Sequence, residues 1–204
     1  MSRVPWTWAV VAWWPPLWLA LGAWLGAVTG WWAVPWFLIL PPLLVRSLAP
    51  WAPAGRHAVG SWPAWCWWCQ YQVQLPFNRL PWCEELLRLL PGASSLWLAL
   101  WGGRLSPLAH WGPGARATDR QWVRVQAGAV LGAGALLGTH AVLHADEGWV
   151  VLVGPVTIEA GAVVGARCVL GPGSSVAAGT MLPATRPLPP GQRWNGRGRE
   201  RDHG

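Results

Sequence analysis

The stretch that decides the fold is LGAGALLGTH at residues 131–140, together with GPVTIEAGAVVGA at residues 154–166 and LGPGSSV at residues 170–176. Across these segments an aliphatic residue returns at every sixth position, with one interruption. The series consists of Val125, Leu131, Leu137, Leu143, Leu152, Ile158, Val164, Leu170, Val176 and Leu182. A helix repeats at 3.6 residues and a plain strand at two, so neither element explains a period of six. A fixed short period predicts a solenoid.

The residues between the aliphatic positions follow the same period. A small residue stands four positions after most aliphatics, and glycine often follows an aliphatic directly, as at Gly132, Gly138, Gly165 and Gly171. We expect three hexapeptides to form one triangular coil, with a short parallel strand on each face and the aliphatic side chain pointing inward. Such coils cannot bury a core alone, so several must stack. Residues 111–182 provide about four of them.

The interruption of the period lies beside two histidines, His140 and His144. Leu143 and Leu152 are nine positions apart instead of six, which predicts that three residues around Asp146-Glu147-Gly148 are extruded from the coil. A base beside an extruded loop is dry on one side and open to substrate on the other, and histidine titrates near neutral pH. The start of the repeat is also irregular, because the register slips by two positions before Val125.

The N-terminal part has the composition of a membrane anchor. Val4–Val45 contains no charged residue, and this length is about twice the ~20 residues that one transmembrane helix needs. We expect two spans, Thr7–Ala27 and Trp31–Val45, although the short second span leaves a re-entrant hairpin open. Arg3 precedes the first span and Arg46 follows the second, so the positive-inside rule places both termini in the cytoplasm. The predicted location is the inner membrane, with the solenoid on its cytoplasmic side.

These patterns divide the chain into four parts. They are a transmembrane or re-entrant helical hairpin at 1–49, an amphipathic helical connector at 50–110, the solenoid at 111–183 and a disordered tail rich in Pro and Arg at 184–204. Within the connector, Trp82–Leu90 and Ala93–Trp101 have the pattern of two short amphipathic helices that lie on the membrane or cap the solenoid.

Charge and cysteine usage narrow the possible partners. The net charge of +7 comes from scattered arginines, which favours anionic lipid or a phosphate-bearing cofactor over nucleic acid. Cys66 and Cys69 form a C-x-x-C pair, which is found in metal half-sites, redox pairs and lipidated segments as well as in structural thiols. No second C-x-x-C completes a zinc site, so we predict no metal there. Cys168 occupies a small-residue position of the repeat, where it serves packing.

The repeat resembles that of the hexapeptide-repeat acyltransferases, whose fold is a left-handed parallel β-helix. The resemblance rests on the three segments quoted above. Two further segments, Phe77-Asn78-Arg79-Leu80-Pro81 and Leu100-Trp101-Gly102, resemble those of a membrane-anchored branch of that family. The resemblance implies a mainly β fold, a homotrimer and acyl transfer from acetyl-CoA or another acyl-CoA. It implies an acceptor hydroxyl or amine on a small molecule or a lipid-linked substrate.

The resemblance also implies a set of site residues. The histidine that acts as general base in the family corresponds to His140, in Gly138-Thr139-His140. Residues expected to support it are His144, Asp146 and Glu147. Coenzyme A is expected along an outer groove, at Gly165, Ala166, Ala184 and Arg186. Arg186 would meet a phosphate in a charge-assisted contact.

Two other functions are compatible with the same repeat. One is a γ-class carbonic anhydrase, in which three histidines hold zinc across a subunit interface; His110, His140 and His144 would provide them. The last two histidines are four positions apart, whereas that family separates them by five. The other alternative is a non-catalytic trimeric scaffold on a membrane anchor. The acyltransferase is the predicted function.

Overall fold

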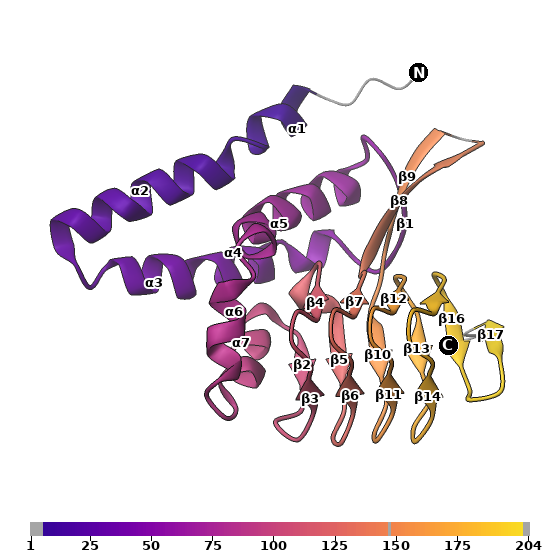
Figure 1. Ribbon diagram of the computed structural model, residues 1–204. Coiled ribbons are helices and arrows are strands. Elements are labelled where there is room, and N and C mark those ends of the chain that lie inside the picture. The colour runs from indigo at the N-terminus through magenta and orange to yellow at the C-terminus, as the bar shows by residue number, and fades with distance from the viewer. Residues whose placement is uncertain (1–5, 147, 202–204) are drawn as a thin grey trace.

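The C-terminal half of the chain forms three sheets of short strands, which the chain visits in the same order in each coil (Figure 1). The structure is a computed structural model that describes residues 6–146 and 148–201. The first sheet contains β2 (Arg104–Leu105), β5 (Val123–Val125), β10 (Val156–Ile158), β13 (Ser175–Val176), β16 (Gln192–Trp194) and β17 (Arg199–Arg201). The second contains β3 (His110–Trp111), β6 (Val130–Leu131), β11 (Val163–Val164) and β14 (Met181–Leu182). The third contains β4 (Arg116–Ala117), β7 (Leu136–Leu137), β12 (Val169–Leu170) and β15 (Pro187–Leu188).

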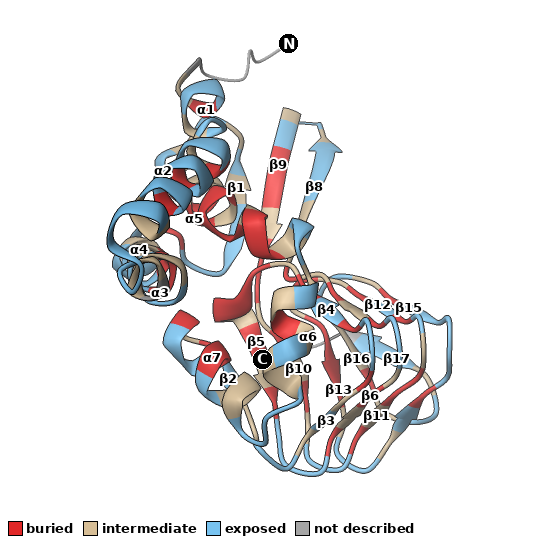
Figure 2. Cartoon of the chain, turned by 60° about the vertical axis from the view of Figure 1, so that its left-hand side comes forward, coloured by how far each residue is buried: buried red, intermediate tan, exposed pale blue. Residues whose placement is uncertain are grey.

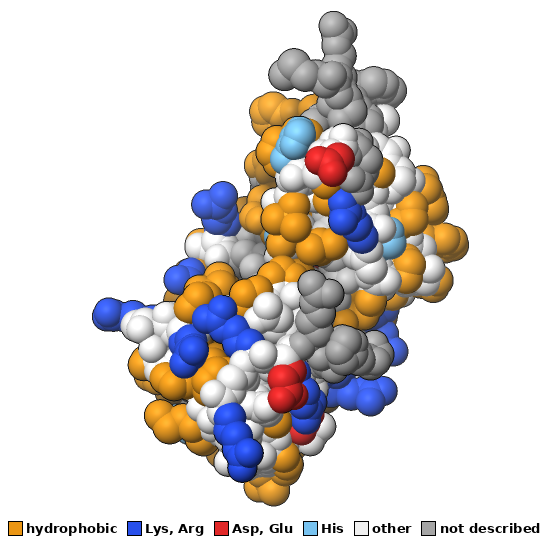
Figure 3. Space-filling view, turned by 90° about the vertical axis from the view of Figure 1, so that its right-hand side faces the viewer, with side chains coloured by type: hydrophobic (Ala, Val, Ile, Leu, Met, Phe, Trp, Pro, Cys, Tyr) orange, Lys and Arg blue, Asp and Glu red, His pale blue; other side chains and the backbone are white. Residues whose placement is uncertain are grey.

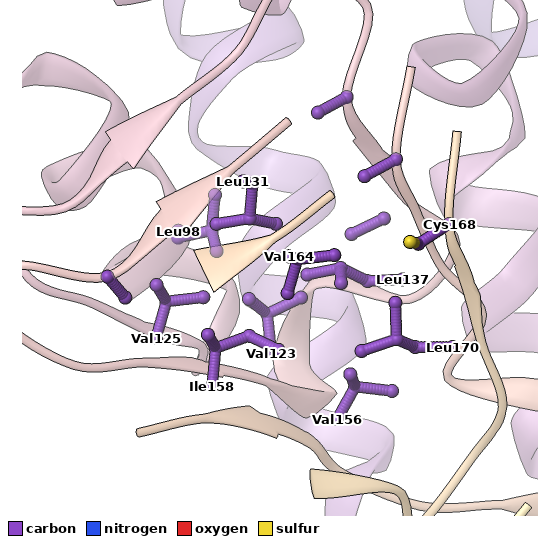
Figure 4. Close-up of a cluster of buried hydrophobic side chains, with 14 of the residues drawn as sticks. Leu98, Val123, Val125, Leu131, Leu137, Val156, Ile158, Val164, Cys168 and Leu170 are labelled. Carbon is purple, nitrogen blue, oxygen red and sulfur yellow. The ribbon is translucent and has the colours of Figure 1, made fainter. Parts of the chain in front are cut away.

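The period of six arises because one strand and one corner together use six residues. Neighbouring coils pair in parallel, with Leu131 opposite Val164 and Leu137 opposite Leu170. These aliphatic side chains are fully buried and point into the interior of the solenoid (Figure 4). Burying one such side chain contributes roughly 1.5–3 kcal/mol, which makes this column the main source of stability in the solenoid.

The solenoid extends further in both directions than the sequence predicts. Its first strand, β2, lies before residue 111, and the predicted disordered tail at 184–204 is wrong over the described residues up to 201. Leu188 and Trp194 continue the spacing of six and are buried, so β15 and β16 add to the solenoid. Pro187 is tolerated because β15 is the edge strand of its sheet. The antiparallel strand β17 then covers the edge of β16.

The extruded segment is much longer than three residues. β8 (His140–Ala145) and β9 (Gly148–Val153) form an antiparallel hairpin that projects from the solenoid. Leu143 and Leu152, which the sequence places in the coil, lie in this hairpin, and Leu143 is 44% exposed. The aliphatic position of the repeat that follows Leu137 is occupied by Ile158, 21 positions later, which pairs with Val125 of the preceding coil. Compared with the regular spacing of six, the inserted segment is two six-residue repeats plus three residues long. The aliphatic positions after it therefore fall where they would fall after an insertion of only three residues.

The N-terminal residues form helices that fold back on each other. They are α1 (Trp6–Val11), α2 (Trp14–Thr29), α3 (Ala33–Leu38), α4 (Leu40–Leu48) and the short 3-10 helix η1 (Ala49–Trp51). Prolines occupy the first turn of α2 and of α4, where no backbone donor is lost. Thr7–Thr29 is long and apolar enough to cross a membrane, and 17% of its most apolar window is buried. The predicted second span is instead divided into α3 and α4.

The connector contains three helices and the strand β1 ahead of the first solenoid strand, β2. The two helices that the sequence predicts correspond to α6 (Trp82–Arg88) and α7 (Ala93–Trp101), while the longer α5 (Trp62–Arg79) was not predicted. α5 packs against α4 and α2, and α7 packs against β2 at the open end of the solenoid. β1 (Gly55–Ala58) pairs with β9 and completes a three-stranded sheet with the hairpin. Figure 2 shows buried residues in α5, α7 and β9.

Candidate active site

Two interruptions of the solenoid lie at the same corner in successive coils. Between the third and first sheets, the chain leaves the coil once between Ala117 and Val123 and again after Leu137. The Thr139 backbone N–H donates to Thr118 Oγ1 at 3.0 Å, which joins the two excursions. The short first excursion therefore lies directly beside the base of the hairpin.

This stacking brings Asp119 and His140 together. Asp119 Oδ2 lies 2.5 Å from His140 Nδ1, and the Asp119 side chain is completely buried. The Thr139 hydroxyl donates to the same carboxylate oxygen at 2.8 Å, and the Asp119 backbone N–H donates to the Thr139 oxygen at 2.9 Å. The Thr118 hydroxyl lies 3.2 Å from Oδ2. The carboxylate is therefore fixed in place by groups on both excursions.

The pair changes the acidity of both partners. Burial disfavours the imidazolium, but the charge and hydrogen bond of Asp119 outweigh burial and raise the pKa of His140 above its usual value. Burial likewise disfavours the carboxylate, but His140 and the two threonine hydroxyls lower the pKa of Asp119 below its usual value. Asp119 is thus ionised at neutral pH and stabilises a positive charge on His140.

Two aromatic side chains of α5 enclose the imidazole. The Trp67 ring lies edge-on to His140 with centroids 4.9 Å apart, and the Tyr71 ring does so at 5.1 Å. The His140 side chain remains 17% exposed. Because Nδ1 faces Asp119 and no described residue hydrogen-bonds Nε2, the Nε2 lone pair is available to accept a proton. This arrangement fits a general base.

A groove of about 460 Å³ adjoins this pair. His140 itself does not line it, but Tyr71 and Thr118 do, and they contact His140 and Asp119 respectively. The other walls come from the end of α5, from Glu84 of α6 and from the outer face of the third sheet. The groove thus reaches the neighbours of the imidazole from the side of the helices.

A buried polar network holds the first excursion against the helices. Arg120 Nε donates to Glu84 Oε1 at 2.5 Å, and both side chains are almost fully buried. The Arg120 guanidinium also donates to Asn78 Oδ1 at 3.0 Å, while Asn78 donates to the Thr118 carbonyl oxygen at 3.0 Å. The Arg120 backbone N–H donates to Gln74 Oε1 at 2.8 Å. Asn78, from the Phe77-Asn78 segment, thereby positions the residue next to Asp119.

The structure brings neither His144 nor Asp146, both predicted to support the base, to His140. His144 lies farther along the hairpin with its ring edge-on to Trp149, at 5.1 Å between centroids. Asp146 is exposed at the hairpin tip, and Glu147 lies outside the described residues. The residue that orients the imidazole is Asp119, which the sequence reasoning missed. The register slip before Val125 was the available signal, because it lies one coil before the larger break.

The residues predicted to contact coenzyme A lie on a different corner. Gly165, Ala166 and Ala184 are at the turns between the second and third sheets, so the width of the third sheet separates them from the His140 corner. Gly165 packs directly on the Ala184 backbone of the next coil. Arg186 is exposed, with its guanidinium 4.7 Å from the centre of the Trp194 ring. Within the described residues, none of these four side chains contacts His140.

The alternative zinc site is not assembled within this chain. His110 is exposed on β3, and His144 lies away from His140 on the hairpin. Among residues 6–146 and 148–201, no three His, Cys, Asp or Glu side chains are grouped as a metal site. In the C-x-x-C pair, burial and the neighbouring Cys66 raise the pKa of Cys69 to about 12, which opposes formation of a thiolate.

No family model and no curated protein matches the sequence. Solved structures with some likeness include a hexapeptide-repeat acetyltransferase of Vibrio cholerae in complex with acetyl coenzyme A. It has 13% identity and a TM-score of 0.35, and the match covers 60% of this chain and 82% of that one. A serine acetyltransferase of Neisseria gonorrhoeae has 14% identity and a TM-score of 0.27 in complex with serine, with 95% and 96% covered. A maltose O-acetyltransferase of Clostridium difficile 630 has 14% identity and a TM-score of 0.26, with 59% and 82% covered. The function must therefore be inferred from the side chains at the His140 corner.

Proposed function

We propose that this protein is an acyl-CoA-dependent acyltransferase in which His140 is the general base. The observation that carries the proposal is the buried Asp119–His140 pair at the interrupted corner. Asp119 fixes the ring with Nδ1 as the donor, which leaves Nε2 to accept a proton from an acceptor hydroxyl or amine. A pair of this kind both orients a base and stabilises its protonated form.

The reaction follows from this arrangement. His140 Nε2 removes the proton as the acceptor oxygen or nitrogen attacks the thioester carbon of the acyl-CoA. The tetrahedral adduct then expels the sulfur of coenzyme A, and the imidazolium returns the proton to that sulfur. The acyl group ends on the acceptor, and Asp119 stabilises the imidazolium between the two steps. Trp67 and Tyr71 exclude water from two sides of the ring.

The acyl donor is proposed to lie along the corner formed by Gly165, Ala166 and Ala184. Acyl-CoA carries phosphates, and the exposed guanidinium of Arg186 is of the type that binds phosphate in charge-assisted hydrogen bonds. Figure 3 views the C-terminal end of the solenoid, where basic side chains are exposed. The side chains of Ala166, which is partly exposed, and of Ala184, which is exposed, are small and leave room at this corner for an extended ligand.

The surroundings of the enzyme are part of the proposal. The segment from α1 to α4 carries many exposed apolar side chains, among them Trp13, Leu17, Trp24, Trp31 and Leu43. Such a surface supports anchoring in the inner membrane, with the β-helical domain on the cytoplasmic side. The proposed β-helix is left-handed and assembles as a homotrimer, as the resemblance of the repeat implies. The acceptor is then a small molecule or a lipid-linked substrate at the membrane surface.

Release of free thiol from acetyl-CoA in the presence of a panel of hydroxyl and amine acceptors tests the proposal. We expect His140→Ala to lower the rate by at least ~100-fold, the lower end for loss of a general base. His144→Ala is the matched control, because that side chain lies on the same hairpin away from the pair, and its rate should stay unchanged. An unchanged rate in His140→Ala would contradict the proposed role of His140. If the protein is a non-catalytic scaffold, this substitution should have no effect.

A further inference from the structure

Two arginines line the groove beside the Asp119–His140 pair and have no charged partner among the described residues. Arg79 is the last residue of α5, and Arg116 begins β4 on the outer face of the third sheet. Both side chains are exposed, and neither forms a hydrogen bond or ion pair with any residue in the described part of the chain. Tyr71, which lines the same groove, feels the positive charge of Arg79 and the negative charge of Asp119. The groove therefore connects the arginines to the neighbourhood of the imidazole.

The remaining charges in the groove do not neutralise these two arginines. Glu84 is the one carboxylate among the described residues that line it, and its Oε1 already accepts from Arg120 and from Trp97 at 2.7 Å. The Glu84–Arg120 pair contributes no net charge. The groove thus presents two free guanidinium groups beside apolar walls that include Leu136 and Val169.

We infer that this groove binds a phosphate group carried by the acceptor. The inference rests on the proposed acyl transfer and names the substrate class for the same site. Guanidinium groups bind phosphate oxygens through pairs of parallel hydrogen bonds, and two of them complement the charge of one phosphate. The apolar wall fits the part of the ligand between the phosphate and the reacting hydroxyl or amine.

The position of the groove favours the acceptor over the acyl donor. Arg79 and Arg116 lie at the end of the solenoid that the helices cover, whereas Arg186 lies in a later coil at the corner between the second and third sheets. The acceptor and the thioester must meet at His140 from different directions, because the nucleophile attacks the carbon while the base holds its proton. Two separate cationic sites are therefore expected when both reactants carry phosphate.

Thermal unfolding of the full chain tests the inference without turnover, in detergent for the soluble probe and in reconstituted vesicles for the lipid probe. A ligand that binds the native state raises the Tm as its concentration exceeds Kd. The soluble probe is glycerol 3-phosphate, and the lipid probe is a phosphatidylcholine vesicle with or without phosphatidic acid. We expect Arg79→Gln and Arg116→Gln each to weaken phosphate binding about tenfold or more, the equivalent of one charge-assisted bond. Arg197→Gln removes the same charge at the far end of the chain and should leave binding unchanged.

The outcomes separate this inference from the proposed chemistry. Protection by glycerol 3-phosphate supports a soluble acceptor, and protection only by phosphatidic acid supports a lipid-linked one. His140→Ala should retain the protection by phosphate ligands even though acyl transfer is lost. Phosphate binding and acyl transfer are therefore tested by separate measurements. The inference is overturned if neither probe protects, or if the double variant Arg79→Gln/Arg116→Gln is protected as well as the wild type. Displacement of glycerol 3-phosphate by coenzyme A would overturn the assignment to the acceptor.

Discussion

Replacing Asp119 by asparagine removes the negative charge of the Asp119–His140 pair and keeps the shape of the side chain. Oδ2 accepts from His140 and the threonine hydroxyls, whereas no described residue hydrogen-bonds the buried Oδ1. An asparagine can therefore place its carbonyl oxygen at Oδ2 and its amide nitrogen at Oδ1 without rearranging the corner. The amide N–H groups would then be buried without partners, which costs roughly 1–3 kcal/mol of stability.

The main effect of Asp119→Asn is expected on the base. Loss of the negative charge removes both interactions that raise the pKa of His140, and burial, which lowers it, acts unopposed. The imidazolium formed during attack also loses its counter-charge, so we expect kcat/KM to fall by about 10² to 10⁴-fold, the range for a general base and for the matching change in a Ser-His-Asp triad.

The pH dependence of the activity shows the direction in which the substitution changes the pKa of His140. In the wild type, activity should rise with pH as His140 loses its proton, through a pKa above the usual histidine value. In Asp119→Asn this limb should move to lower pH, and an NMR titration of the imidazole should show the same shift without any acceptor. Asp146→Asn is the control, because that carboxylate is exposed at the hairpin tip. An acid limb that stays in place, or a rate equal to wild type, would refute the role of Asp119.

Two further predictions concern buried contacts that stabilise the fold. Glu84→Gln leaves the buried Arg120 guanidinium without its counter-charge, so we expect a loss of about 3–5 kcal/mol in the free energy of unfolding, measured by denaturant titration. A stability within error of wild type would show that the pair is dispensable. Gly165→Ala places a Cβ against the backbone of Ala184, and we expect about 1–3 kcal/mol of destabilisation. Gly198→Ala has open space around its Cβ and should melt like the wild type; equal melting of both variants would contradict the close stacking of coils.

The solenoid was predictable because its period is local and strict. Each step of six residues places one aliphatic inside, and this pattern alone indicates parallel strands that stack. The size of the hairpin was not predictable in the same way. Inserting whole six-residue repeats leaves the spacing pattern unchanged, so the pattern shows only the residues left over. Leu143 and Leu152 satisfied the pattern by spacing, yet they lie on hairpin strands whose own period of two also supplies alternate aliphatics.

The site was predictable only in part, because it depends on contacts between distant segments. His140 was predicted from the resemblance of the repeat and from its place beside the break. Asp119 was missed because its role arises only when two successive coils are stacked, 21 residues apart in sequence. Trp67 and Tyr71 come from α5, which was not predicted: its buried face includes glutamines such as Gln70 and Gln74, so it lacks a simple apolar stripe.

The pairing of β1 with the hairpin has a practical consequence for anyone who wishes to study the solenoid alone. A polypeptide that begins at residue 111 would lack β1, leaving β9 with a bare edge of unpaired backbone groups. It would also lack α5, and with it the two rings that enclose His140 and the amide of Asn78 that supports Thr118. The helical and solenoid parts therefore both contribute to the surroundings of His140, and the proposed acyl transfer should be assayed on the full chain.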